Sequence, residues 1–227
     1  MTSATVEDYL KTIYQLQQEA QAACCGPDCG EVPVSTSALA ERLNLAPASI
    51  TSMMGRLAQV ELAVYTPYQG VRLTPHGEKM ALHVIRRHRL LELYLAEKLG
   101  LGWDQVHEEA ERLEHHISPL LEEHITAALG NPQTDPHGHP IPTVEGQLPA
   151  EEGTRLDLLP IEQLAVIRSV GDDNPELLRY LAARGMYPGT GLVITEREPF
   201  GGSLHVRVGT QEVTLSVAAA GRILVTI

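Results

Sequence analysis

Apolar residues recur at helical spacing along the first sixty positions and predict three helices. The expected helices span about Val6 to Ala22, Ser37 to Leu43 and Pro47 to Val60. Ser35 or Thr36 can cap the second helix, and a proline suits the first turn of the third, where its missing N–H costs little. A short helix, a tight turn and a second helix with an apolar spine are typical of a helix-turn-helix unit.

Alternating residues from Val64 to Leu73 predict two short strands around a turn that contains Gly70, and Val32 to Val34 predicts another short strand. A hairpin behind a recognition helix is a wing, so we expect a winged helix-turn-helix DNA-binding domain over residues 1–74. The alternative, an unrelated small helical domain, does not explain this order of elements. Candidate DNA contacts are Pro47, Ser49, Thr51, Ser52 and Arg56 on the helix, and Tyr68, Gln69 and Arg72 on the wing.

The pattern of residues 75–130 predicts a helical domain. A long helix from Pro75 to Leu99 ends at Gly100, another begins near Asp104, and a third runs from Ser118 to Leu129. The long helix carries more apolar surface than one winged-helix core needs. Because such excess usually forms a dimer interface, we expect a homodimer.

The periodicity changes again after residue 130. Residues 131–154 are proline-rich and typical of a linker, and residues 155–227 hold several short strands with glycine-rich turns. This pattern predicts a small SH3-like β-barrel, so the fold class is mainly α with small β. The expected elements are strands at Leu164–Val170, Leu192–Thr195, Leu204–Val208, Glu212–Leu215 and Ile223–Ile227, and a helix at Glu176–Ala183.

Composition narrows the class of protein. A hydrophobic content of 43% and a charged content of 20% are those of a soluble globular protein. Because no apolar run is long enough to cross a bilayer and the first residues lack a signal-peptide pattern, we expect a cytoplasmic protein without a membrane partner. The net charge is −12, and residues 1–74 alone hold four basic and seven acidic residues. DNA binding must then rest on a few placed contacts instead of bulk attraction.

Candidate metal ligands gather on the helix near residue 107. On a helical wheel, His107, Glu111, Glu114 and His115 share one stripe, beside an apolar stripe of Val106, Ala110, Leu113 and Ile117. Grouped carboxylates repel one another unless a cation neutralises them. A second pair, His88 and Glu92, lies one turn apart on the long helix. The alternative is two charged amphipathic helices that carry histidines by chance.

Two further groups have weaker patterns. Cys24, Cys25 and Cys29 lie in one short stretch without a second pair, which indicates reduced thiols in a surface loop, with a redox or soft-metal role as the alternative. His137 and His139 flank a glycine in the linker and could bind a metal. A histidine pair in a flexible loop is more often only solvated.

Four segments together resemble the diphtheria-toxin-repressor family of metal-dependent transcription regulators. They are Thr5-Val-Glu-Asp8-Tyr-Leu-Lys-Thr-Ile-Tyr14, the helix-turn-helix with its wing, Arg87-His88-Arg89-Leu-Leu-Glu92, and Val106-His107-Glu-Glu-Ala-Glu111-Arg-Leu-Glu114-His115. The linker and the barrel also look like the family's. In its iron-type members, the positions that match Asp8 and Glu111 carry Met and Cys. The oxygen ligands here resemble the manganese-type branch, although that branch often has a carboxylate where this chain has Lys11.

The resemblance implies two metal sites. Asp8, Glu111, Glu114 and His115 match the primary site, and His88, Glu92 and His107 match the ancillary one. The family's ancillary site also takes ligands from the SH3-like domain, where Asp172 is our candidate.

We therefore expect a homodimeric Mn(II)-dependent repressor that binds a double-stranded DNA operator and controls manganese or iron uptake genes. Carboxylate and imidazole ligands suit Mn(II) or Fe(II), while the Irving–Williams order predicts that Zn(II), Co(II) or Cd(II) binds in vitro. One alternative is an Fe(II)-responsive repressor of the same fold. Another is a metalloenzyme that activates water, but the sequence shows no substrate cleft and we expect no enzyme activity.

Overall fold

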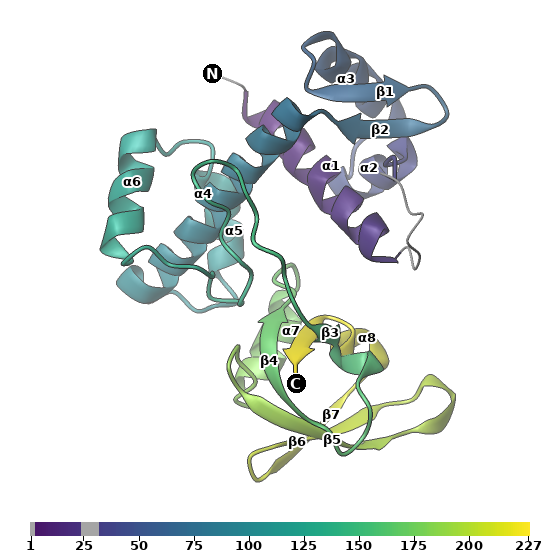
Figure 1. The fold of residues 1–227 in the computed structure, drawn as a ribbon, viewed down its shortest axis with the longest axis vertical. Helices are drawn as coiled ribbons and strands as arrows, with labels where there is room; N and C mark the ends of the chain where they lie inside the picture. The colour runs from purple at the N-terminus through teal and green to yellow at the C-terminus, as the bar shows by residue number, and fades with distance from the viewer. Residues whose placement is uncertain (1–2, 24–31) are drawn as a thin grey trace. The chain divides into compact units, whose positions relative to one another are not determined.

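The computed structural model describes residues 3–23 and 32–227, which fall into two compact units (Figure 1). The first holds the residues up to 86 together with 142–147, and the second holds 87–141 together with 148–227. The three cysteines, for which we predicted a surface loop, lie outside the described residues. None of the described helices is long and apolar enough to span a membrane.

The first unit is the predicted winged helix-turn-helix. Its α3 begins at Pro47 as expected, and the apolar spine of this helix is buried while the opposite face is exposed. Ser35 caps α2, accepting a hydrogen bond from the Ala38 N–H, and Asn44 ends that helix in the left-handed region. The elements are α1 (Ala4–Ala23), α2 (Thr36–Leu43), α3 (Pro47–Gln59), β1 (Ala63–Thr66) and β2 (Gly70–Leu73).

The wing is held by a third stretch of extended chain. Strands β1 and β2 pair antiparallel, and Val34 forms a bridge with Val71 through two backbone hydrogen bonds of 2.8 and 2.9 Å. Gly70 has a φ of +114°, and a Cβ there would come within 2.5 Å of the Val34 carbonyl oxygen. The turn therefore requires glycine at this position.

The second unit contains most of the helical domain. Helix α4 (Pro75–Leu99) starts in the first unit and continues into the second, where α5 (Val106–Leu113) and α6 (Pro119–Ala128) follow. Leu90, Leu91, Ala110, Ile125 and Ile141 form its small core. One prediction was wrong: Leu113 is 39% exposed, whereas Glu114 is fully buried. Because α5 ends at Leu113, the apolar stripe does not continue along one helix.

The predicted barrel is a six-stranded antiparallel sheet with the strand order β3-β8-β4-β5-β6-β7 (Figure 1). The alternating residues of its strands bury one continuous apolar core. Four short elements, β3, η1, η2 and α8, were not predicted because they are too short to show a period. The elements are β3 (Thr154–Arg155), η1 (Leu156–Leu158), β4 (Leu164–Val170), α7 (Pro175–Ala182), β5 (Gly191–Arg197), η2 (Pro199–Gly201), β6 (Leu204–Val208), β7 (Gln211–Leu215), α8 (Val217–Ala220) and β8 (Ile223–Thr226).

Part of the predicted linker is a tight turn that lies against the end of β4. One Asp135 carboxylate oxygen accepts hydrogen bonds from the N–H groups of His137 and His139, at 2.8 and 3.0 Å. The His137 carbonyl accepts a hydrogen bond from the Val170 N–H at 2.9 Å. His137 is 0% exposed, so the interpretation of this histidine pair as solvated was wrong.

Gly138 allows this close approach. Its φ is +91°, and a Cβ on it would overlap the carbonyl oxygen of Arg168 on β4. We therefore predict that Gly138→Ala destabilises the protein by more than backbone strain alone, which costs about 1–3 kcal/mol. Gly130→Ala is the matched control, because Gly130 has a φ of +73° and an added Cβ there would have no atom within 4 Å. Urea unfolding measures both, and equal losses of stability would contradict the proposed contact.

Candidate metal centre

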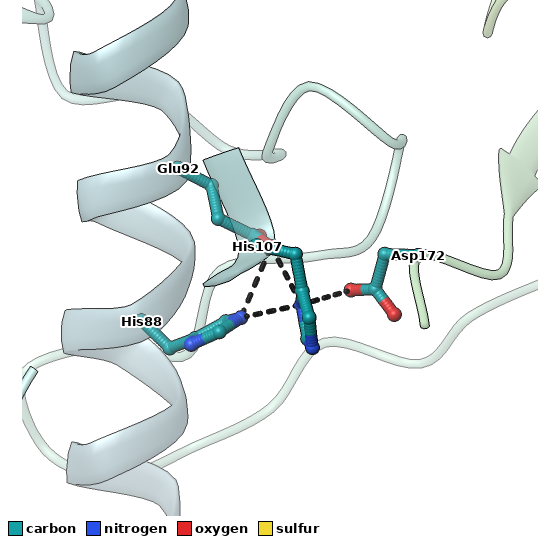
Figure 2. Close-up of side chains that lie close together, drawn as sticks. All are labelled: His88, Glu92, His107 and Asp172. Atoms are coloured by element: carbon teal, nitrogen blue, oxygen red, sulfur yellow. Dashed lines mark hydrogen bonds and ion pairs between the residues drawn. The ribbon is translucent and has the colours of Figure 1, made fainter. Parts of the chain in front are cut away.

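Three predicted ancillary ligands converge in the second unit. His88 and Glu92 lie one turn apart on the buried side of α4, and His107 lies in the first turn of α5 (Figure 2). One Glu92 oxygen is 3.0 Å from His88 Nε2 and 3.1 Å from His107 Nδ1, and the two nitrogens are 3.2 Å apart. Two imidazoles and a carboxylate thus direct their polar atoms at one point.

Asp172 joins this group from the barrel, just after β4 (Figure 2). One carboxylate oxygen lies 3.9 Å from His107 Nδ1 and 3.7 Å from His139 Nδ1. One ligand atom from each of His88, Glu92, His107 and Asp172 lies within 4.8 Å of the others. The residue predicted as the barrel's contribution is therefore beside the predicted ancillary set, while its role as a ligand stays a prediction.

The turn of the linker adds Asp135, which we did not assign to a site, and His137, for which a solvated position was the favoured interpretation. Asp135 and His137 form a second candidate group with Glu92 and Asp172, again with their ligand atoms within 4.8 Å. The alternation Asp135-Pro-His137-Gly-His139 was the available signal, because every second side chain is polar and two are imidazoles. The burial of this turn depends on contacts with β4, and no local sequence pattern predicts those contacts.

Two buried atoms in this group accept or donate no hydrogen bond among the described residues. Glu92 Oε2 and His137 Nδ1 are both buried without a hydrogen bond, and they lie 3.8 Å apart. An unpaired buried polar atom costs about 1–3 kcal/mol. A cation would pair with both of them, and the nitrogen and oxygen donors fit a divalent first-row metal ion. The residues present therefore fit a metal site.

Burial and neighbouring charges shift the pKa values of this group in opposite directions. Burial raises the pKa of the Glu92 carboxyl, but the His88 charge and a hydrogen bond from His107 outweigh this effect and hold the pKa well below its usual range. Burial lowers the pKa of His139, but the Asp135 carboxylate outweighs burial and raises it to about 9. The Asp135 carboxylate thus favours the protonated form of His139. Because an imidazole binds a metal through a deprotonated nitrogen, metal binding at such a group competes with protons.

The predicted primary ligands of the second unit lie around Glu114. One buried Glu114 oxygen is 2.6 Å from His88 Nδ1, and the other is 3.5 Å from His115 Nε2. Glu111, which is partly exposed, has an oxygen 3.7 Å from His88 Nδ1. His88 therefore contacts the primary group with one ring nitrogen and the Glu92 group with the other. Asp8 lies on α1 in the first unit, and its assignment stays a prediction.

The predicted DNA contacts of α3 are all exposed, and the Thr51 hydroxyl donates to the Pro47 carbonyl at 3.1 Å. At the wing, Tyr68 and Gln69 are exposed in the turn, whereas Arg72 is half-buried on β2. The exposed predicted contacts are Pro47, Ser49, Thr51, Ser52 and Arg56 of α3, with Tyr68 and Gln69 of the wing. Their roles toward DNA stay predictions.

Three family models match the chain. The iron-dependent repressor N-terminal DNA-binding domain matches residues 27–71, its metal-binding and dimerisation domain matches 74–143, and the FeoA domain matches 154–227. The iron-dependent repressor IdeR of Mycobacterium tuberculosis is 32% identical over 223 residues, which are 93% of this chain and 92% of that protein.

Solved structures of metal-binding repressors are also similar to this chain. A manganese-dependent transcriptional repressor in complex with manganese is 35% identical, with a TM-score of 0.85 over 97% of this chain and 98% of that one. ScaR with bound Zn²⁺ is 30% identical, with a TM-score of 0.79 over 97% and 98%.

The DNA-binding unit, the helical domain and the barrel define a metal-dependent transcriptional repressor, which is not an enzyme. The chain belongs to the diphtheria-toxin-repressor family.

The raised pKa of His139 predicts how stability depends on pH in the metal-free protein. The folded-state pKa of about 9 exceeds the unfolded value of about 6.5. The stabilisation is therefore complete below about pH 6.5 and is lost as the pH rises toward 9. Urea unfolding of the metal-free protein should give a steep fall over this range, and His139→Asn should make the fall shallower. His76→Asn, at an exposed position, measures the effect of removing a histidine outside the cluster. An identical fall in the parent and in His139→Asn would contradict this prediction.

Proposed function

We propose that this protein is a Mn(II)-responsive, dimeric repressor that binds an operator near genes of manganese or iron uptake. The metal-sensing role is supported best by the buried group around Glu92. There imidazoles and carboxylates converge, and two buried polar atoms have no hydrogen bond among the described residues. The relatives' DNA-binding and dimerisation domains support the operator and the dimer.

The choice of Mn(II) rests on the ligand atoms. Asp8 and Glu111 offer oxygen where the family's iron-type members carry Met and Cys, and hard oxygen donors suit Mn(II) better than sulfur does. Fe(II) is the second candidate, because IdeR, an iron-dependent repressor by name, is 32% identical to this chain. Zn(II), Co(II) and Cd(II) should bind in vitro by the Irving–Williams order, and ScaR has been solved with Zn²⁺ and with Cd²⁺.

The proposed primary site combines Asp8 of α1 with Glu111, Glu114 and His115. When bound, the ion supplies positive charge that neutralises these carboxylates, which otherwise repel one another. Asp8 would then be held with the α5 residues, so that α1 and the helix-turn-helix attached to it keep one position. In a dimer, the two α3 helices would present their exposed polar faces to successive major grooves of a palindromic operator.

The proposed ancillary site is the Glu92 group. His88, His107 and Asp172 would hold a second ion there, and Asp135 and His137 extend the donor set. Because Asp172 comes from the barrel, this ion would order the barrel and α4 together. It would not bind Asp8, so its effect on the DNA-binding unit should be indirect.

Metal selectivity tests the proposed function. The double variant Asp8→Met/Glu111→Cys should shift the response toward Fe²⁺, because sulfur ligands disfavour the hard Mn²⁺ ion. Anaerobic DNA-shift titrations with Mn²⁺ and with Fe²⁺ give the ratio of half-activating concentrations. Glu108→Cys is the matched control, since Glu108 is an exposed carboxylate on the same helix. If the ratio of half-activating Mn²⁺ and Fe²⁺ concentrations were the same in the double variant as in the parent, residues other than Asp8 and Glu111 would set the choice of metal.

The two sites should differ in their effect on DNA binding. Glu111→Ala or His115→Ala should abolish metal-activated operator binding and leave a folded dimer. His107→Ala, like His88→Ala, should only weaken it, by about 1–3 kcal/mol of coupling free energy. Fluorescence anisotropy of a labelled operator measures both effects, with Glu108→Ala as the control. If Mn²⁺ activated operator binding by Glu111→Ala as strongly as by the parent, Glu111 would not be a ligand of the primary site.

A further inference from the structure

The single tryptophan of the chain, Trp103, lies in the loop between α4 and α5, against His137. Its indole stacks on the His137 imidazole, with ring centroids 5.6 Å apart and an interplanar angle of 23°. The indole also contacts Tyr187 of the barrel, with centroids 4.8 Å apart, and it packs against the barrel core. Trp103 therefore connects the linker turn with the barrel.

The backbone of Trp103 also determines which ring nitrogen of His137 carries the proton. Its carbonyl oxygen is 2.8 Å from His137 Nε2. A carbonyl can only accept, so Nε2 carries the proton and the lone pair of the neutral ring is on Nδ1. This Nδ1 is the buried atom that lies 3.8 Å from Glu92 Oε2 without a hydrogen bond.

Histidines that bind metals almost always donate the other ring N–H to a carbonyl or carboxylate, which orients the ring. The contact between Trp103 and His137 has this form. The indole N–H is itself buried without an acceptor among the described residues. Because that costs free energy, the ring's position needs a reason other than its own hydrogen bonding. Its stacking on His137 and its contacts with Tyr187 and the barrel core supply that reason.

We propose that Trp103 is a positioning residue of the metal centre: it holds His137 in the Nε2–H tautomer with Nδ1 directed at the Glu92 group, and through Tyr187 it ties this ligand to the barrel. The importance of this role for metal binding rests on the proposed function. The tautomer itself is a property of the metal-free protein and can be tested without any ion.

The first test is ¹⁵N NMR of the histidine rings in the metal-free protein, at a pH where the His137 ring is neutral. The His137 signals are assigned by their loss in His137→Gln. The expected result is the Nε2–H tautomer in the parent and in Trp103→Phe, which keeps a stacking ring and the carbonyl. Trp103→Ala should show a mixture of both tautomers. An Nδ1–H tautomer in the parent would overturn the proposal, whether or not the Trp103 variants fold.

The second test is calorimetric titration with Mn²⁺. Loss of a group that orients a ligand typically costs about 10–100-fold in metal affinity, which we expect for Trp103→Ala. Trp103→Phe should bind close to the parent. Equal affinity and an unchanged tautomer in Trp103→Ala would overturn the positioning role and leave the proposed function intact. If the parent bound no Mn²⁺, the proposed function would fail. The NMR measurement of the His137 tautomer would still show whether Trp103 orients this ring.

Discussion

The buried carboxylate of Glu92 is the constraint on which the second unit depends. This side chain is 0% exposed, and an isolated buried charge costs several kcal/mol unless it is paired. Its partners come from α4, α5 and the linker turn, with Asp172 of the barrel beside them. Segments far apart in the sequence therefore meet around one charge. Removing that charge, or exchanging its protons for a metal ion, changes the free energy of every contact in the group.

The linker turn shows how backbone and site chemistry support each other. Arg89 of α4 donates to the Pro140 carbonyl, and Asp135 accepts from two N–H groups of the turn. His137 in turn binds both β4 and Trp103 through its backbone and its ring. Because these contacts hold the backbone and Nε2 of His137, its Nδ1, which has no hydrogen bond among the described residues, faces Glu92. This is the preorganisation that a selective metal site needs.

The sequence predicted those parts that have a local signal. The apolar spine of α3, the proline at its start and the alternating strands of the barrel each have a period or a cap that a short window reveals. Asp172 was found through the family resemblance. The burial of His137 was missed, because it depends on the Val170 N–H and on the close approach at Gly138, which lie in distant parts of the chain. The burial of Glu114 in place of Leu113 was missed because α5 ends at Leu113, whereas the predicted apolar stripe needed a helix that continued to Ile117.

The most direct test of the metal centre is anomalous diffraction at the manganese edge from crystals grown with Mn²⁺. These assignments predict an anomalous peak within about 2.0–2.6 Å of a Glu92 carboxylate oxygen, the range of metal–oxygen distances for hard divalent ions. His88, His107, His137 or Asp172 should supply the other protein ligands. An ordered Glu92 group without such a peak, in crystals whose Mn²⁺ is bound elsewhere, would contradict the central claim.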